Sequence, residues 1–214
     1  MKEDTKILVI GRSGCGKDTF AHKMIKDCGL KQLISTTTRP MRYPGEDTHV
    51  FVTEEEAATM TERVAETVID GYQYFATQQQ LDESDIYIID PKGLYDVCKN
   101  SHNTNICVVF VYASDEVRRN RAIWRAADQE LAAKVFESRT KSEDAQFKEF
   151  ENMLFNEDIC MFRMKYPSVT NIIVVDNDKA DVNKVYDSAE KVYKLLNAQT
   201  LRKYNPYSPM YYEM

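Results

Sequence analysis

Four short apolar runs recur along the chain, and the polar stretches that follow them have apolar residues at helical spacing. The runs are residues 7–10, 86–89, 106–112 and 172–175. Unbroken apolar runs of this length are typical of strands that are buried on both faces. Strands that alternate with helices in this way predict an α/β fold, with a mostly parallel sheet covered by helices on both sides. In such sheets, ligands bind beyond the carboxyl ends of the strands.

Helix signals lie between these strands. Gly29 is a stop signal for the helix that follows the first strand, and Ser114 is an N-cap for a helix over 114–126. Apolar residues recur at helical spacing over 128–155, which predicts one long amphipathic helix with an interruption near residue 142. A last helix, over 182–196, has one clear apolar face.

A smaller group of strands is expected between the first two core strands. Gly71 breaks an alternating stretch into the two arms of a hairpin. Thr53 and Glu56 form a T-x-x-E capping box, which starts a short helix. Two prolines and a glycine predict a loop over 35–47. The expected strands of this group are 32–34, 49–52, 63–69 and 72–76.

Composition excludes several classes of protein. The net charge is −6, which argues against broad binding to nucleic acid or to an anionic membrane. The apolar run near the N-terminus is too short for a signal peptide or a membrane span. The five cysteines are scattered and show no disulfide pattern, so reduced thiols and a cytoplasmic location are expected.

The segment between the first strand and the first helix matches a phosphate-binding loop. Its pattern G-x-x-x-x-G-K is complete through Lys17. In such loops backbone N–H groups turn towards phosphate oxygens, the helix N-terminus adds partial positive charge, and the lysine reaches the outer phosphates. A glycine turn without a ligand is the alternative interpretation. The residues expected to bind phosphate are Gly11, Ser13, Gly14, Cys15, Gly16, Lys17, Asp18 and Thr19.

Two residues of this loop have further interpretations. Asp18 stands where a magnesium-binding hydroxyl is expected, and Thr19 lies about 100° further around the helix, so it cannot replace that hydroxyl. We expect Asp18 to bind Mg²⁺ directly or through water, which makes activity depend strongly on the metal. Cys15 is interpreted as an incidental small residue; a reactive thiolate whose oxidation blocks phosphate binding is the alternative.

Arginines supply further candidate phosphate ligands. Arg39 and Arg42 flank a proline in a polar loop, and two guanidinium groups close together suit a phosphate. A solvated basic turn is the alternative. A second cluster shares one face of the helix over 114–126 and either closes over transferring phosphates or is an exposed, paired face. This cluster comprises Arg118, Arg121 and Arg125, and Arg139 on the following helix could complete it.

Two carboxylates are candidates for the chemistry as well. Asp90 ends a buried strand, where it could hold Mg²⁺ through water, cap the following helix, or do both. Glu66 lies in an alternating stretch and could accept two hydrogen bonds from a purine edge. An exposed glutamate is the more common case.

Taken together, these segments resemble guanylate kinase. The resemblance starts at the phosphate-binding loop and becomes specific at Ser35–Arg42, followed by Pro44-Gly45-Glu46 and by Phe51–Glu55. Glu66 precedes Phe75 by the interval at which the family's guanine-reading glutamate precedes its second tyrosine. The resemblance covers roughly residues 5 to 195 and is strongest in the first half of the chain.

The resemblance implies a P-loop three-layer sandwich with a small β-rich lobe for the nucleoside monophosphate and a helical lid. It implies one domain, 1–197, followed by a tail, 198–214. The core would comprise 1–34, 77–113 and 156–197, the lobe 35–76, and the lid with its long helix 114–155. A monomer or a homodimer is expected.

The resemblance also implies roles for individual residues. Catalysis would fall to Lys17, Arg39, Arg121, Arg125 and Arg139. The metal would be held by Asp18 and Asp90. The acceptor would be bound by Ser35, Arg39, Arg42, Glu46, His49, Glu66, Phe75, Thr77 and Asp90.

Several positions depart from the family pattern. His49 stands where the family has a phosphate-binding tyrosine, and Phe75 lacks the hydroxyl of the second tyrosine. Tyr43 is an extra residue, Ala76 replaces a glycine and Ile88 replaces an aspartate. A shifted substrate preference is therefore expected.

The function implied is transfer of phosphate from ATP, with Mg²⁺, to a nucleoside monophosphate, most simply GMP or dGMP. Two alternatives remain: a kinase for another nucleotide or phosphorylated small molecule, and a guanylate-kinase-like module that binds proteins. Such modules generally lose the phosphate-binding loop, whereas Lys17 and both of its glycines are present here.

Overall fold

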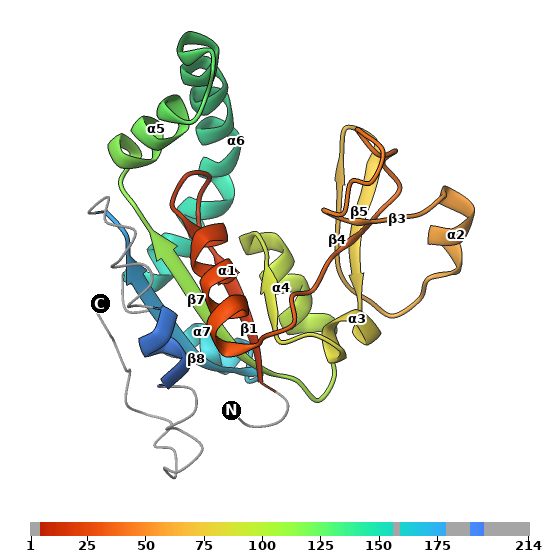
Figure 1. Ribbon diagram of the computed structural model, residues 1–214. Coiled ribbons are helices and arrows are strands. Elements are labelled where there is room, and N and C mark those ends of the chain that lie inside the picture. Colours follow the sequence, from red (N-terminus) through yellow and green to blue (C-terminus); the bar gives the residue numbers. More distant parts are fainter. Residues whose placement is uncertain (1–4, 156–158, 179–188, 195–214) are drawn as a thin grey trace.

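A four-stranded parallel sheet forms the centre of the protein (Figure 1). The strand order is β6-β1-β7-β8, and Ile7 of β1 pairs with Ile86 on one side and Cys107 on the other. These strands are β1 (Thr5–Ile10), β6 (Ile86–Ile88), β7 (Asn105–Tyr112) and β8 (Val169–Asp176). In this computed structural model the described residues are 5–155, 159–178 and 189–194.

Helices cover both faces of this sheet because its strands are apolar on both faces. One face packs against Phe20 and Met24 of α1 and against Val192. The other packs against Leu94 of α4 and Phe150 of α6. The predicted α/β fold is therefore confirmed, with a sheet between two helical layers. The helices of these layers are α1 (Lys17–Cys28), α4 (Pro91–Asn100), α6 (Gln129–Phe155) and α7 (Ile159–Lys165).

A second four-stranded sheet stands beside the first, with the order β3-β2-β5-β4. The predicted hairpin forms one side of this sheet, with β4 at the edge, and Gly71 turns the chain there with a φ of 83°. The predicted capping box is present, with Thr53 and Glu56 bonded reciprocally at the start of α2 (Glu54–Thr59). The strands are β2 (Thr36–Thr37), β3 (Val50–Phe51), β4 (Arg63–Ile69) and β5 (Tyr72–Thr77).

The structure corrects two of the predicted strand and loop assignments. The strand expected over 32–34 is absent, and only Gln32 forms a single bridge, with Ile86. The loop expected over 35–47 contains β2, because Thr36 and Thr37 pair with both β3 and β5.

Three helices differ from the sequence prediction. α6 continues through Ser142, whose hydroxyl donates to the Arg139 carbonyl within the helix and so does not interrupt it. α3 (Gln78–Asp82) and α7 were not predicted. Of the helix expected over 182–196, residues 189–194 are described and are helical. The expected tail, 198–214, lies outside the described residues.

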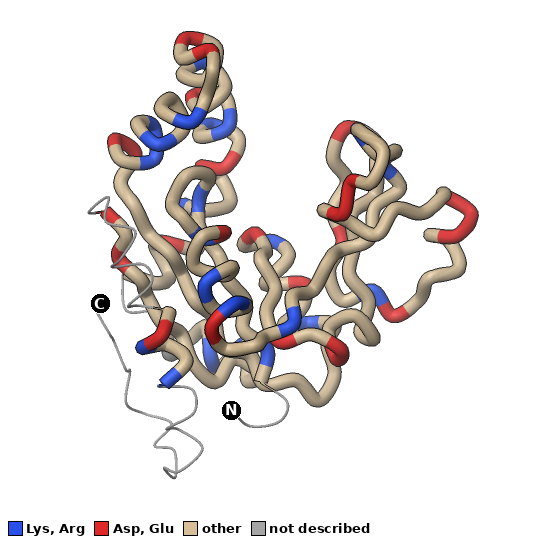
Figure 2. Tube along the Cα trace, viewed as in Figure 1, with Lys and Arg blue, Asp and Glu red and all other residues tan. Residues whose placement is uncertain are grey.

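Two bodies project from the carboxyl-terminal edge of the central sheet. α5 (Asp115–Trp124) and the first half of α6 form an arm on one side of the loop before α1, and the second sheet stands on the other side (Figure 1). α5 begins with two acidic residues and then carries several arginines (Figure 2). No helix in the described part is long and apolar enough to cross a membrane.

Candidate functional site

The loop between β1 and α1 has a backbone geometry that gathers N–H donors. Gly14 and Gly16 have φ values of 81° and 99°, in the left-handed region that favours glycine. The first hydrogen bond of the helix runs from the Phe20 N–H to the Gly16 carbonyl. The N–H groups of the first turn, starting at Lys17, therefore have no partner within the helix. An anion is favoured at this position.

The loop approaches neighbouring strands closely, which also requires glycine. A Cβ on Gly11 would lie 2.5 Å from both the Cys15 sulfur and the Val111 carbonyl oxygen. A Cβ on Gly16 would collide with the amide nitrogen of Asn177. That amide donates to the Cys15 carbonyl at 2.7 Å. The loop is thereby held against the ends of β7 and β8.

Lys17 and Asp18 place one charge of each sign at the start of α1. The Lys17 Nζ atom lies 3.6 Å from an Asp18 carboxylate oxygen. The Asp18 side chain is 64% exposed and that of Lys17 is 20% exposed. Both are available to a ligand that lies on the helix N-terminus, and Thr19 is exposed beside them.

Cys15 is an inert residue of this loop. Its side chain is buried, and burial raises the pKa of its thiol. The protonated thiol is a poor nucleophile. The interpretation of Cys15 as an incidental small residue is the one that its surroundings favour.

Two arginines of α5 brace the loop from behind. Arg118 is fully buried and donates to the Ser13 carbonyl at 3.0 Å and to Asp115 at 2.6 Å. Arg121 donates to the carbonyls of Gly14 and Cys15 at 3.3 and 3.1 Å. These guanidinium groups bind the carbonyls of the loop, so the N–H groups of the first turn of α1 stay free of them. Burial lowers the pKa of Arg121, which stays charged.

The other two arginines expected over the phosphates are exposed. Arg125 is the C-cap of α5, and Arg139 lies on α6. Within the described residues neither side chain makes a hydrogen bond or an ion pair. The predicted triad on α5 therefore divides: Arg118 and Arg121 bind the loop, and Arg125 faces solvent.

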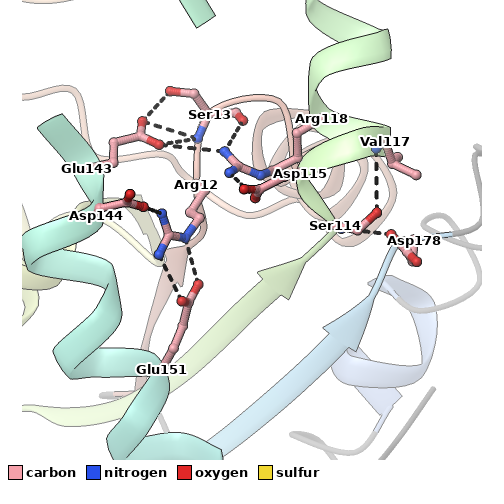
Figure 3. A network of polar contacts seen from close by, with 10 residues as sticks. All are labelled: Arg12, Ser13, Ser114, Asp115, Val117, Arg118, Glu143, Asp144, Glu151 and Asp178. Carbon is pink, nitrogen blue, oxygen red and sulfur yellow. Dashed lines mark hydrogen bonds and ion pairs between the residues drawn. The ribbon is translucent and has the colours of Figure 1, made fainter. Parts of the chain in front are cut away.

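Carboxylates of α6 dock on the same loop (Figure 3). Arg12 binds Glu151 through two hydrogen bonds of 2.8 and 2.9 Å and Asp144 through one of 2.6 Å. These partners raise the pKa of Arg12 further above its already high value. The Ser13 N–H donates to both Glu143 oxygens at 3.2 Å, and the Ser13 hydroxyl also donates to Glu143. α6 is thereby fixed to the loop.

Ser35 and His49 meet on the second sheet. The Ser35 hydroxyl lies 3.0 Å from the His49 Nδ1 atom, and the His49 ring packs edge-on against Tyr74 with centroids 5.4 Å apart. Burial lowers the pKa of His49. The imidazole is therefore neutral at physiological pH and suits hydrogen bonding rather than charge pairing with a phosphate.

Arg39 is held by a buried carboxylate. It donates to the two oxygens of Glu46 at 3.3 and 2.8 Å and packs over the Phe51 ring. Glu46 also accepts from the Arg42 N–H and from the Thr48 hydroxyl, both at 2.8 Å. The Arg39 partner, first among these, lowers the pKa of Glu46 to about 2. Glu46 shapes the loop, and the Arg42 side chain is left exposed.

Glu66 is engaged by an arginine that the sequence analysis did not single out. Arg63 donates to Glu66 at 2.6 Å and to the Gln73 side-chain oxygen at 2.9 Å. Its guanidinium lies 3.9 Å from the centre of the buried Phe75 ring. It also donates to the Ala57 carbonyl at 2.6 Å. The Glu66 carboxylate is 45% exposed, so one edge remains open to a ligand.

Thr77 and Asp90 act as helix caps. Thr77 caps α3 in a second capping box, with Gln80. The Asp90 carboxylate accepts from the Gly93 N–H at 2.6 Å at the start of α4. Since β6 and β1 are neighbouring parallel strands, Asp90 lies at the same edge of the sheet as the phosphate-binding loop.

No protein-family model matches the chain, and no curated protein matches it. A guanylate kinase from Anaplasma phagocytophilum matches it in structure, with a TM-score of 0.51 and 17% identity over 94% of this chain and 88% of that one. The fold is similar to that of guanylate kinase. An uncharacterized protein from Eubacterium ventriosum ATCC 27560 matches over 90% and 98% of the two chains, with 12% identity and a TM-score of 0.40.

Four residues of this site were missed by sequence reasoning. Arg63 stands three residues before Glu66, a spacing that gives no contact signal in a strand. Glu143 and Arg12 are far apart in sequence, and one acidic residue among many on a polar helix carries no signal. Asn177 could have been found, because it follows the last core strand, where ligands and loops meet.

A surface hollow of about 520 Å³ lies elsewhere, at the carboxyl-terminal half of α1. The loop Gly11–Gly16 is at the other end of that helix. The residues that line the hollow are Lys23, Asp27, Cys28, Ala189, Glu190, Tyr193 and Lys194.

Proposed function

We propose that this protein is a nucleoside monophosphate kinase, which transfers the terminal phosphate of ATP to a nucleoside monophosphate, with GMP or dGMP as the first candidate. The observation that carries the proposal is the loop Gly11–Thr19. Its carbonyls are bound by the buried Arg118 and the partly buried Arg121, its first-turn N–H groups are unpaired within the helix, and Lys17 stands beside them. The fold, which is similar to that of guanylate kinase, supports it.

The donor would bind at the N-terminus of α1. Backbone N–H groups and Lys17 would neutralise its phosphates. ATP brings Mg²⁺, and the exposed Asp18 carboxylate is available to that ion directly or through water. Within the described residues no three His, Cys, Asp or Glu side chains gather to hold a metal by themselves. The metal would therefore be bound mainly by the phosphates.

The acceptor would bind against the second sheet. Arg39 and Arg42 would hold its phosphate, and Ser35, Glu66 and Thr77 would contact its base, with Asp90 beside them. Glu46 is the residue that orients Arg39. Transfer needs no base catalyst: the protein aligns the acceptor oxygen with the terminal phosphate and neutralises the charge, for which Arg121, Arg125 and Arg139 are candidates.

A different acceptor nucleotide is the second candidate, and the Arg63–Glu66 ion pair favours it. A carboxylate that reads guanine must accept from two N–H groups of the base. One oxygen of Glu66 already accepts from Arg63 at 2.6 Å, so that oxygen has a single lone pair left for a base. A base with a different edge would not depend on that oxygen.

The test is ADP release from MgATP with a panel of nucleoside monophosphates, for the native protein and for Lys17→Ala. We expect turnover with at least one monophosphate, and a loss of about 100-fold or more in kcat for Lys17→Ala, because charge neutralisation at transferring phosphates has this magnitude. Lys26→Ala, in the exposed last turn of the same helix, is the control and should keep native activity.

Two outcomes would contradict the proposal. Folded native protein that turns over none of the monophosphates is not a kinase of this class. Turnover by Lys17→Ala within about threefold of native would remove the loop from the donor site.

A further inference from the structure

The phosphate-binding loop holds an anion of its own in this structure. Both donors of Ser13, the backbone N–H and the hydroxyl, are directed at the Glu143 carboxylate of α6 (Figure 3). The Arg118 guanidinium lies 3.7 Å from the same carboxylate. A backbone N–H, a hydroxyl and a guanidinium are the donor types that bind phosphate oxygens.

Arg118 has donor capacity beyond its present bonds. Its side chain is fully buried, and its Nε atom has no hydrogen-bond partner within the described residues. Its charge is shared between Asp115 at 2.6 Å and the more distant Glu143 at 3.7 Å. A buried guanidinium with an unused N–H gains from a ligand that carries more charge than a carboxylate.

Glu143 and a nucleotide phosphate would oppose each other. Ser13 directly precedes Gly14, the first glycine of the loop with a positive φ. A polyphosphate bound on the loop would bring several negative charges close to the carboxylate, where like charges repel most strongly in partly buried surroundings.

We propose that Ser13 and Arg118 form an anion subsite at the edge of the phosphate-binding loop, which Glu143 fills when no nucleotide is bound and which an outer phosphate of a nucleoside triphosphate takes over. The inference rests on the donor half of the proposed function. Binding of the phosphate releases Glu143, which removes one of the contacts between α6 and the loop and leaves those of Asp144 and Glu151 with Arg12.

The release has a consequence for Arg139. It precedes Glu143 by four residues, so the two share one face of α6 and are separated by about 6 Å along the helix axis. Exchange of Glu143 for phosphate loosens the segment of α6 that carries this exposed arginine, with Asp144 and Arg12 as the remaining contact nearest to it. The same event that binds the donor thus allows Arg139 to approach it.

The competing interpretation is that Glu143 permanently supports the loop, and it predicts the opposite effect of a Glu143 substitution on nucleotide affinity. If Glu143 only supports the loop, its replacement loosens the donor site and weakens nucleotide binding. If Glu143 competes with phosphate, its replacement by a neutral group strengthens binding.

The test compares dissociation constants of ATP and AMP, measured calorimetrically with Mg²⁺, for native protein, Glu143→Gln and Asp144→Asn. Glu143→Gln should bind ATP about fivefold tighter or more, the lower end of typical coupling between two ligands, and AMP unchanged, since AMP lacks outer phosphates. Asp144→Asn removes the same charge from the adjacent residue, which contacts Arg12 instead of the loop amide, and should stay within about twofold.

Equal or weaker ATP binding by Glu143→Gln overturns the inference, and Glu143→Ala, which removes both carboxylate oxygens, must agree in direction. Tighter ATP binding by Glu143→Gln, without phosphorylation of any monophosphate by the native protein, would support the anion subsite and contradict the proposed kinase activity. Absence of ATP binding in the native protein and in both Glu143 variants overturns both proposals.

Discussion

Glu66 and Arg63 decide what the acceptor side can read. The Arg63 guanidinium occupies one oxygen of the Glu66 carboxylate and leaves the other edge exposed. Guanine offers a carboxylate two N–H donors, and hypoxanthine offers only one, because it lacks the 2-amino group. The ratio of kcat/KM for GMP over IMP therefore measures how far Glu66 reads the base.

We expect Glu66→Gln to lower that ratio by about tenfold, because a hydrogen bond to a charged group in a partly buried site contributes about 1.5–3 kcal/mol. Steady-state kinetics with GMP and IMP is the measurement. Glu55→Gln, on the exposed side of α2, is the matched control. A ratio that does not change would remove Glu66 from the base site and favour another acceptor.

The ionisation of Glu46 makes the folding stability of the protein depend on pH. Its pKa is lowered from 4.5 to about 2, first by the hydrogen bond from Arg39. A lowered folded-state pKa means that the ionised group contributes stability above its unfolded pKa and that this contribution is lost as pH falls from about 4.5 towards about 2. Glu46→Gln removes the contribution at all pH values.

The expected result is a lower urea midpoint for Glu46→Gln than for native protein at neutral pH, with a difference that shrinks as pH falls below about 4.5. Asp47→Asn, an exposed neighbour in the same loop, should show no such convergence. A difference that is constant from about pH 7 to about pH 3 would show that the ion pair does not set the stability of this loop.

Single residues were predictable from sequence where the signal is local. Thr53 with Glu56 shows this, because a capping box joins residues three apart and needs no knowledge of the rest of the chain. Asp90 was predicted as a helix cap for the same reason. The contact between Glu143 and Ser13 spans 130 residues, and only the packing of α6 on the sheet creates it.

At the scale of elements, length and burial decided which predictions succeeded. β1 and β7 are buried and β8 is partly buried, and each carries an unbroken apolar run, so their sequence signal is strong. β2 has two residues, and its existence depends on pairing with β3 and β5 rather than on its own composition. α3, with five residues, is too short for a periodic signal.

α6 illustrates a further limit. Its 27 residues carry a weak apolar stripe, because the helix packs Phe147 and Phe150 on the sheet and also presents acidic residues to the loop. Sequence reasoning identified the helix but expected a break near Ser142. No role was predicted for the acidic residues that contact the loop, Glu143, Asp144 and Glu151.

At the scale of the whole molecule, the central sheet and its loop lie between the α5–α6 arm and the second sheet (Figure 1). The proposed donor site lies on the loop of the central sheet and the proposed acceptor site on the second sheet, so catalysis requires these two parts to approach each other with water excluded. The net charge of −6 makes this approach depend on local arginines, which gather on α5 (Figure 2).

A ligand that joins both sites tests this arrangement. Adenosine and guanosine linked through five phosphates would span the loop before α1 and the second sheet, and its affinity should exceed that of ATP by about 100-fold or more, since linked ligands gain from effective concentration. Trp124, the only tryptophan, is 86% exposed at the end of α5 and reports movement of the arm through its fluorescence.

The linked ligand should change Trp124 emission more than ATP or GMP alone, because it occupies the loop and the second sheet together and so favours the state in which the arm covers both. The analogue with two adenosines separates the two halves: it should bind with the affinity of the donor site alone if the second sheet reads guanine. Equal affinity of both analogues would show that the second sheet does not distinguish guanine from adenine. Affinity of the guanosine analogue no higher than that of ATP would mean that the two bodies do not form one site.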